Sequence, residues 1–156
     1  MLEGFMSTAV FAEDIRFERG DQVSIIGIFP DEIQISGKKS PPPELEGKVA
    51  VQTIPKLSVY ARTHLPASSY KGGSLEFWVE APSGKKVFSS ESDEDFLRAE
   101  FEKSRAKGDE EITLISHLIF SPFPVREFGR FKAFVSCMGE SIEAGHLSII
   151  FTEQTS

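Results

Sequence analysis

The sequence predicts a mainly all-β fold: an antiparallel β-sandwich, immunoglobulin-like in general arrangement, with one inserted amphipathic helix. Segments rich in Val, Ile, Phe and Thr recur along the 156 residues, separated by clusters of Gly, Pro, Asp and Ser. Two of these segments, 57–65 and 75–81, alternate apolar and polar residues as half-buried strands do. With 40% apolar residues and 14 Phe, the chain can bury a core without disulfides. We expect a single domain over residues 1–156.

The N-terminal region predicts a chain of short strands. Residues 7–12 and 14–18 can form one bent strand, and 22–29 and 31–35 follow. Arg19-Gly20-Asp21 is typical of a tight turn. Gly27 inside a strand indicates a bulge or the close approach of another backbone. Residues 36–48 contain three consecutive prolines, which donate no ladder hydrogen bonds, so a surface loop is expected there.

The middle and C-terminal regions supply the rest of the sandwich. Alternation in 57–65 and 75–81 predicts inward faces made by Leu57, Val59, Ala61, Thr63 and Leu65, and by Leu75, Phe77, Val79 and Ala81. A turn at 82–85 leads into a strand at 86–90. Residues 112–120 are apolar on both faces, which predicts a central strand. Residues 129–138 and 144–152 predict a terminal antiparallel hairpin.

One segment breaks the strand rhythm and predicts a helix over 93–106. Ser92 is a candidate N-cap, acidic residues follow it, and Lys103, Arg105 and Lys107 precede Gly108. These are start and stop signals of the right polarity for the helix dipole. Leu97 and Phe101 are four residues apart, so a narrow apolar stripe faces the sheets.

Composition excludes several classes of partner and suggests a compartment. The formal net charge of −7 disfavours a nucleic-acid binder or a binder of anionic membranes, since both need basic surfaces. We expect no membrane segment, because no apolar run approaches about 20 residues, and no signal peptide, because the first ten residues carry no Lys or Arg. A lone Cys137 gives no disulfide framework, which favours the cytoplasm.

The N-terminal residues carry a resemblance. Two segments joined by a Gly turn read Phe11-Ala12-Glu13-Asp14-Ile15-Arg16-Phe17-Glu18 and Val23-Ser24-Ile25-Ile26-Gly27-Ile28-Phe29. They are similar to the opening of a family of small bacterial and phage proteins described only as a domain of unknown function. The resemblance implies a β-sandwich and no chemistry. Asp14 and Arg16 lie on the same face of their strand. We expect this pair to fix strand register, or to belong to a family-specific binding site.

The candidate binding residues lie on the outward faces of the two alternating segments. Tyr60, Arg62 and His64 alternate with the inward set of 57–65, and Trp78 does so in 75–81, between Glu76 and Glu80. If the two strands are neighbours, these side chains form an aromatic and guanidinium patch of the kind enriched at protein interfaces. The alternative is burial under the 36–48 loop or the helix.

No catalytic or metal-binding pattern is visible in the sequence. His64, His117 and His146 are far apart, without the spacing of a zinc site, and Cys137 falls on a core face, where a thiol stays protonated. The acidic segment 91–111 can hold Ca²⁺ if Asp93, Asp95 and 109–111 meet at one end of the sandwich. We favour the simpler interpretation, an acidic helix start that complements its dipole.

These observations predict a non-catalytic interaction module, without a cofactor or metal, that presents a strand face or edge to a protein partner or to a second copy. The alternative is a small-ligand or carbohydrate-binding domain that uses Trp78 and Tyr60 as a stacking platform. A calcium-dependent sandwich domain or an enzyme of unknown class ranks third.

Overall fold

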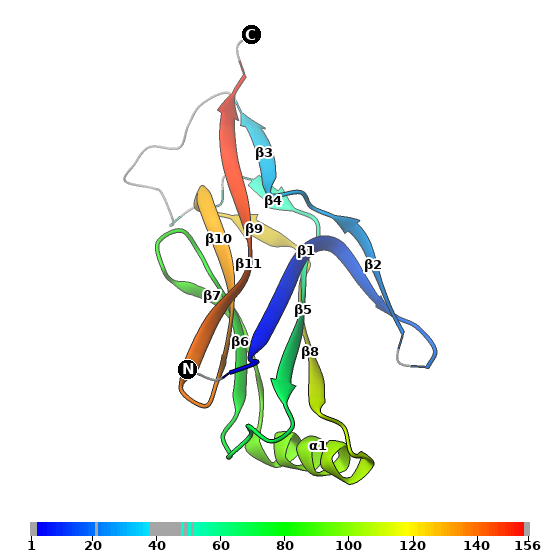
Figure 1. The fold of residues 1–156 in the computed structure, drawn as a ribbon. Helices are drawn as coiled ribbons and strands as arrows, with labels where there is room; N and C mark the ends of the chain where they lie inside the picture. The colour runs from blue at the N-terminus through cyan, green and yellow to red at the C-terminus, as the bar shows by residue number, and fades with distance from the viewer. Residues whose placement is uncertain (1–2, 21, 38–47, 49, 51, 155–156) are drawn as a thin grey trace.

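The computed structural model describes residues 3–20, 22–37, 48, 50 and 52–154, which form a two-layer β-sandwich with one helix at its end (Figure 1). The four-stranded sheet has the order β2-β1-β5-β8. Its strands are β1 (Met6–Phe17), β2 (Val23–Ile28), β5 (Leu57–Pro66) and β8 (Glu111–Phe120). The mainly-β sandwich is confirmed, while the immunoglobulin-like arrangement and the single domain stay predictions.

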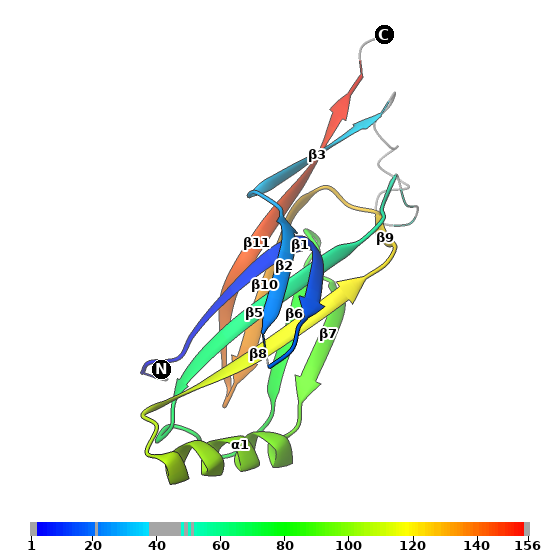
Figure 2. The same ribbon diagram turned by 90° about the vertical axis from the view of Figure 1, so that its right-hand side faces the viewer.

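The second layer is a five-stranded sheet with the order β3-β11-β10-β6-β7. Its strands are β3 (Glu32–Gly37), β6 (Leu75–Glu80), β7 (Lys86–Ser92), β10 (Gly129–Cys137) and β11 (Glu140–Glu153). The terminal hairpin β10–β11 is confirmed. A third, two-stranded sheet of β4 (Gln52–Ile54) and β9 (Phe123–Val125), which the sequence did not predict, lies at the end of the molecule away from the helix (Figure 2).

Among the described strands, β3 and β11 pair in parallel, and the other pairings are antiparallel. β11 is 14 residues long and β10 only nine, and their pairing ends at Gly129 opposite Ile149. β3 pairs in parallel with the opposite edge of β11, from Ser148 to Glu153, so Ser148 and Ile149 have a strand on each side. The chain reaches this position because it leaves the other sheet after β2.

The core fills the space between the two sheets, as the alternating patterns predicted. Leu57, Val59, Ala61, Thr63 and Leu65 of β5 are all buried, and so are Leu75, Phe77, Val79 and Ala81 in and after β6. Burial of such side chains is the main stabilising contribution in a fold of this size.

β11 of one sheet passes close to β1 of the other. A Cβ atom built on Gly145 would lie 2.4 Å from the carbonyl oxygen of Ala9. The ladder between β10 and β11 shifts register beside it, between Ala133 and Phe134. Glycine is therefore required at this position by the proximity of another backbone.

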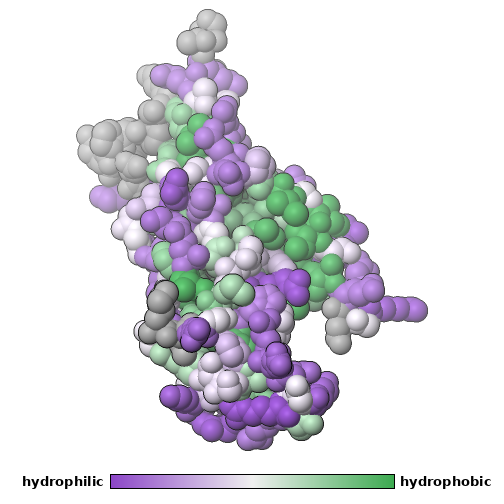
Figure 3. Space-filling view, in the orientation of Figure 1, coloured by the Kyte–Doolittle hydropathy of each residue, from purple (hydrophilic) through white to green (hydrophobic). Residues whose placement is uncertain are grey.

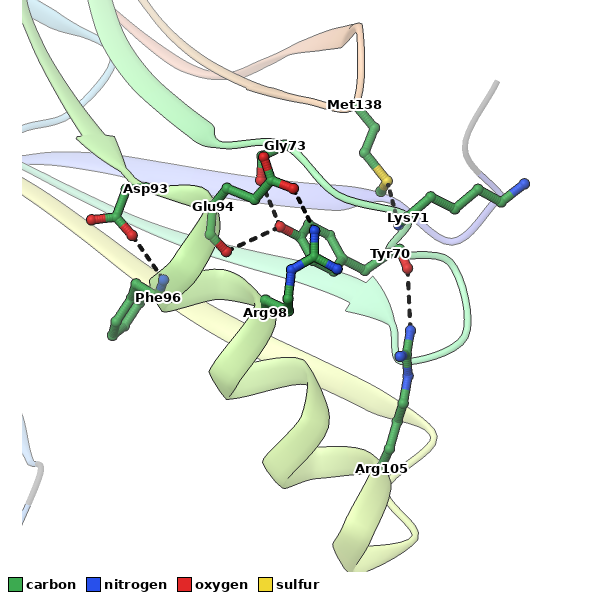
Figure 4. Close-up of polar contacts among 9 residues, drawn as sticks. All are labelled: Tyr70, Lys71, Gly73, Asp93, Glu94, Phe96, Arg98, Arg105 and Met138. Carbon is green, nitrogen blue, oxygen red and sulfur yellow. Dashed lines mark hydrogen bonds and ion pairs between the residues drawn. The ribbon is translucent and has the colours of Figure 1, made fainter.

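The helix α1 (Glu94–Lys107) closes one end of the sandwich (Figure 2). Leu97 and Phe101 are buried, as the apolar stripe predicted, and Phe101 stacks on Tyr70 with ring centroids 4.4 Å apart. The N-cap is Asp93 rather than the expected Ser92: its carboxylate accepts a hydrogen bond from the Phe96 amide at 2.8 Å (Figure 4). Ser92 instead belongs to β7, whose pairing with β6 extends to this residue.

Polar contacts to the preceding loop hold α1 in place (Figure 4). The Tyr70 hydroxyl lies 3.4 Å from the carbonyl oxygen of Glu94, the first residue of α1, and donates to the carbonyl of Gly73 in its own loop at 2.7 Å. Arg105, near the other end of the helix, donates to the carbonyls of Ala67 at 2.9 Å and Tyr70 at 3.2 Å. The helix is thus anchored along its length, and its outer residue Phe96 is left 52% exposed.

Candidate functional site

The β1–β2 hairpin folds back over the outer face of the four-stranded sheet. Only Met6 to Ala12 of β1 pair with β5, whereas Ala12 to Phe17 pair with β2. Figure 2 shows the second half of β1 and β2 in front of β5 and β8. Phe17 contacts His117 of β8 with ring centroids 4.6 Å apart. Ile15 is buried, although it lies outside the cluster between the sheets.

This fold-back corrects the expectation for β8. The sequence predicted a central strand, but among the described strands β8 lies at the edge of its sheet and pairs only with β5. Its outward face carries the apolar residues Ile115 and Ile119, and the hairpin approaches that face. Ile115 and Ile119 remain 47% and 41% exposed, so the hairpin covers the face only in part.

A groove of about 510 Å³ lies between the hairpin tip, α1 and β8, and we call it the edge groove. Its lining residues are Phe17, Glu18, Gln22, Val23, Ser92, Phe96, Glu100, Thr113, Leu114, Ile115 and His117.

The lining shows how the edge groove runs. Thr113, Ile115 and His117 alternate along the outer face of β8, whereas Leu114 points to the core side. A groove that touches both faces of an edge strand runs along its free edge. Phe17, Phe96 and Ile115, which come from three different elements, are each about half exposed there, at 55%, 52% and 47%. The edge groove therefore combines an unpaired strand edge with accessible apolar side chains.

Three of the predicted site residues lie beside this groove. In the ladder between β5 and β8, Tyr60 is opposite His117, Arg62 is opposite Ile115, and His64 is opposite Thr113. Directly opposite side chains in an antiparallel pair are in contact range. Arg62 is exposed, while Nδ1 of His64 contacts the Glu111 carboxylate at 2.8 Å.

Trp78 does not join them, which corrects the expected patch. It lies in β6 of the other sheet, so β5 and β6 are not neighbours. Its side chain is only 8% exposed, because Phe134 stacks on it at 5.5 Å and the ammonium group of Lys86 lies 4.3 Å from the ring centroid. The platform expected from Trp78 and Tyr60 is not formed, and Trp78 itself has little ring surface left for a sugar.

Asp14 and Arg16 share a face as predicted and are linked by an ion pair of 3.4 Å. Lys56, which the sequence analysis did not single out, binds the same carboxylate at 2.5 Å. This contact, followed by the one from Arg16, holds the pKa of Asp14 below its ordinary value, although partial desolvation opposes them. Lys56 directly precedes β5, so the contact ties the hairpin bend to the start of that strand. The pair lies outside the edge groove.

Gly27 has a left-handed φ of 65°, and a Cβ atom there would lie 2.7 Å from the Glu13 carboxylate. The predicted close approach is thus made by a side chain and not by a backbone.

No group of three or more His, Cys, Asp or Glu side chains suited to a metal ion is present in the described part of the chain. Asp93, which the calcium alternative named as a ligand, caps α1. Cys137 is buried, and burial raises the pKa of its thiol. The 36–48 loop falls almost entirely outside the described residues, as does Asp21 of the predicted turn.

Comparisons with known protein families, with curated proteins and with solved structures found no match to this chain. Among the described residues, no helix has the length and apolar character needed to cross a membrane. The resemblance of the N-terminal residues to a bacterial and phage family stays a prediction.

Proposed function

We propose that this protein is a non-catalytic interaction module that binds an extended segment of a partner protein along the free edge of β8. The observation that carries the proposal is the lining of the edge groove, which includes residues from both faces of an edge strand. A segment added beside β8 gains main-chain hydrogen bonds from the strand edge. Alternate side chains of that segment then face Phe17, Phe96 and Ile115.

The charges around the edge groove favour a basic partner segment. Among the described residues that line it, Glu18 and Glu100 are acidic and none is Lys or Arg. The Glu100 carboxylate is only loosely neutralised, since its nearest ion-pair partner, Lys103, lies at 3.9 Å. We therefore expect the bound segment to alternate apolar residues and to carry Lys or Arg at its ends.

A second copy of the chain fits less well than a different protein. A two-fold symmetric pairing of β8 with β8 brings the same surface of both copies together. Glu18 and Glu100 of both copies then lie in one interface, between chains that each have a net charge of −7. Like charges facing each other oppose association.

Synthetic peptides test the proposal directly. The probe is an eight-residue peptide with Ile or Val at alternate positions and two Lys at each end, labelled for fluorescence anisotropy. We expect saturable binding to the purified chain, and about tenfold weaker binding when Glu replaces the Lys residues. N-methylation of alternate backbone amides on one edge of the peptide should abolish binding, while methylation on the opposite edge should not, because only one edge can pair with β8.

Two matched variants locate the binding surface. Ile115→Lys places a charge in the edge groove and should weaken binding at least about tenfold. Ile28→Lys makes the same change at an apolar residue of β2 that is 58% exposed and outside the groove lining. Figure 3 shows an apolar surface over the β1–β2 hairpin. Ile28→Lys should leave binding unchanged. Equal loss in both variants, or indifference to N-methylation, would refute edge binding.

A cytoplasmic location, suggested by the single cysteine, belongs to this proposal as well. So does a bacterial or phage origin, which rests on the resemblance of residues 11–29.

A further inference from the structure

A second cavity, of about 230 Å³, lies beside the end of β8 that points away from α1. We call it the aromatic pocket. Four phenylalanines contribute to its lining: Phe88, Phe120, Phe123 and Phe131.

These rings form one connected cluster. The centroids of Phe88 and Phe120 are 3.6 Å apart, and Phe123 meets Phe88 at 6.0 Å and Phe131 at 5.9 Å, both edge to face. Phe88, Phe123 and Phe131 are each less than a tenth exposed, so their packing fixes the shape of the cavity. A rigid aromatic lining of this kind accepts a flat apolar group without reorganisation.

The polar part of the lining is mainly cationic in an otherwise acidic protein. It consists of Lys85, Lys86, Arg126 and Glu127.

Two of these charges already have partners. Lys86 binds the Glu76 carboxylate at 2.6 Å, and Glu127 accepts a hydrogen bond from the Ser83 amide at 3.0 Å. Lys85 and Arg126 make no ion pair with any residue that the structure describes, although Arg126 donates to the Lys48 carbonyl at 3.1 Å. Both residues are exposed.

We propose that the aromatic pocket binds a small organic monoanion with one aromatic ring and a short carboxylate arm. The ring packs among the phenylalanines, and the carboxylate meets Lys85 and Arg126. The size of the cavity sets the upper limit on the ligand: an apolar cavity of about 150 Å³ holds benzene, so 230 Å³ takes one ring and a short arm.

This inference goes beyond the proposed interaction with a protein segment and is independent of it. The aromatic pocket and the edge groove share no lining residue. Failure of one proposal therefore leaves the other standing, and variants of each site serve as controls for the other.

Titration with 3-phenylpropionate, followed by amide chemical shifts in ¹⁵N-labelled full-length chain, tests the proposal. We expect saturable shifts at residues 85–88 and 120–127, with a Kd on the order of 1 mM, which is reasonable for a ligand of this size. The neutral 3-phenylpropanamide should bind about three- to tenfold more weakly, and 3-phenylpropylamine more weakly still, because exposed ion pairs supply only a modest preference.

Charge-reversing variants complete the test. Lys85→Glu and Arg126→Glu should each weaken 3-phenylpropionate binding by about threefold and reduce its advantage over the amide. Lys71→Glu makes the same change at an exposed lysine outside the pocket lining and should have no effect. Absence of saturable shifts at these residues, equal binding of the anion and the amine, or an equal loss in Lys71→Glu would overturn the proposal.

Discussion

Gly145 is the residue whose replacement most directly tests the packing of the two sheets. Its φ lies outside the left-handed region, so alanine can adopt the backbone conformation. The obstacle is steric: the new Cβ would lie 2.4 Å from the carbonyl oxygen and 3.2 Å from the carbonyl carbon of Ala9. Contacts under 3 Å between such atoms require a shift, and here the atoms that must move are backbone atoms of β1.

The size of the effect follows from the cost of overpacking. Inserting a methyl group into a tightly packed interior destabilises a protein by about 1–3 kcal/mol. For a chain of this length each kcal/mol lowers Tm by about 2–4 °C, so Gly145→Ala should lower Tm by about 2–12 °C. Urea unfolding followed by tryptophan fluorescence gives the free energy of unfolding independently, and the slope with urea should stay unchanged.

A second substitution distinguishes a clash with the Ala9 backbone from a clash with the Ala9 side chain. The Ala9 side chain is farther from the new Cβ, at 3.4 Å, than the Ala9 carbonyl oxygen is. Ala9→Gly in the Gly145→Ala background should therefore fail to restore stability. Full rescue by Ala9→Gly, or a Gly145→Ala protein as stable as the original, would refute the backbone crossing.

Three further predictions concern the helix cap, the hairpin anchor and the buried thiol. Asp93→Ala should lower the free energy of unfolding by about 0.5–2 kcal/mol, and Ser92→Ala by clearly less; equal losses in urea melts would contradict the cap assignment. Lys56→Met should raise the pKa of Asp14, measured by NMR titration of its carboxyl carbon, because it removes the main interaction that lowers it. Since the pKa of Asp14 is lower in the folded than in the unfolded state, its carboxylate stabilises the protein at pH values above the unfolded-state pKa. This stabilisation disappears as the pH falls through the folded-state pKa. In Lys56→Met, the loss of stability over this acidic range should be smaller. Cys137 should react with a disulfide reagent at pH 8 only after denaturant is added, as burial raises its thiol pKa; rapid labelling of the native protein would contradict its burial.

The sequence predicted which side of its sheet a side chain points to better than it predicted how exposed that side chain is. Trp78 does point to the outer side of its sheet, opposite Phe134. Its burial comes from a neighbour on β10 and from Lys86 on β7, and which strands flank β6 is not encoded in the alternation of β6 itself. The same holds for the expected patch: the alternation assigned Tyr60 and Trp78 to outward faces but carried no information on whether those faces belong to one sheet.

The candidate site was missed for a related reason. Residues 112–120 are apolar on both faces, a pattern typical of a central strand. An edge strand partly covered by a folded-back hairpin produces the same pattern. The signal that distinguishes them is the exposed Phe17 at the end of β1, whose contact with His117 connects residues 100 positions apart.

Local chemistry, acting within a few residues, determined which segments alternate apolar and polar residues and which side chains fill the core. It also determined the two ends of the helix to within one residue. Only the tertiary structure decided that β3 runs parallel to β11, that the β1–β2 hairpin folds over β8, and that Gly145 lies against Ala9. Strand and helix periodicity arises from backbone geometry that each segment carries in itself. The choice of neighbouring strands depends on contacts between distant segments, and these form only when the whole chain packs.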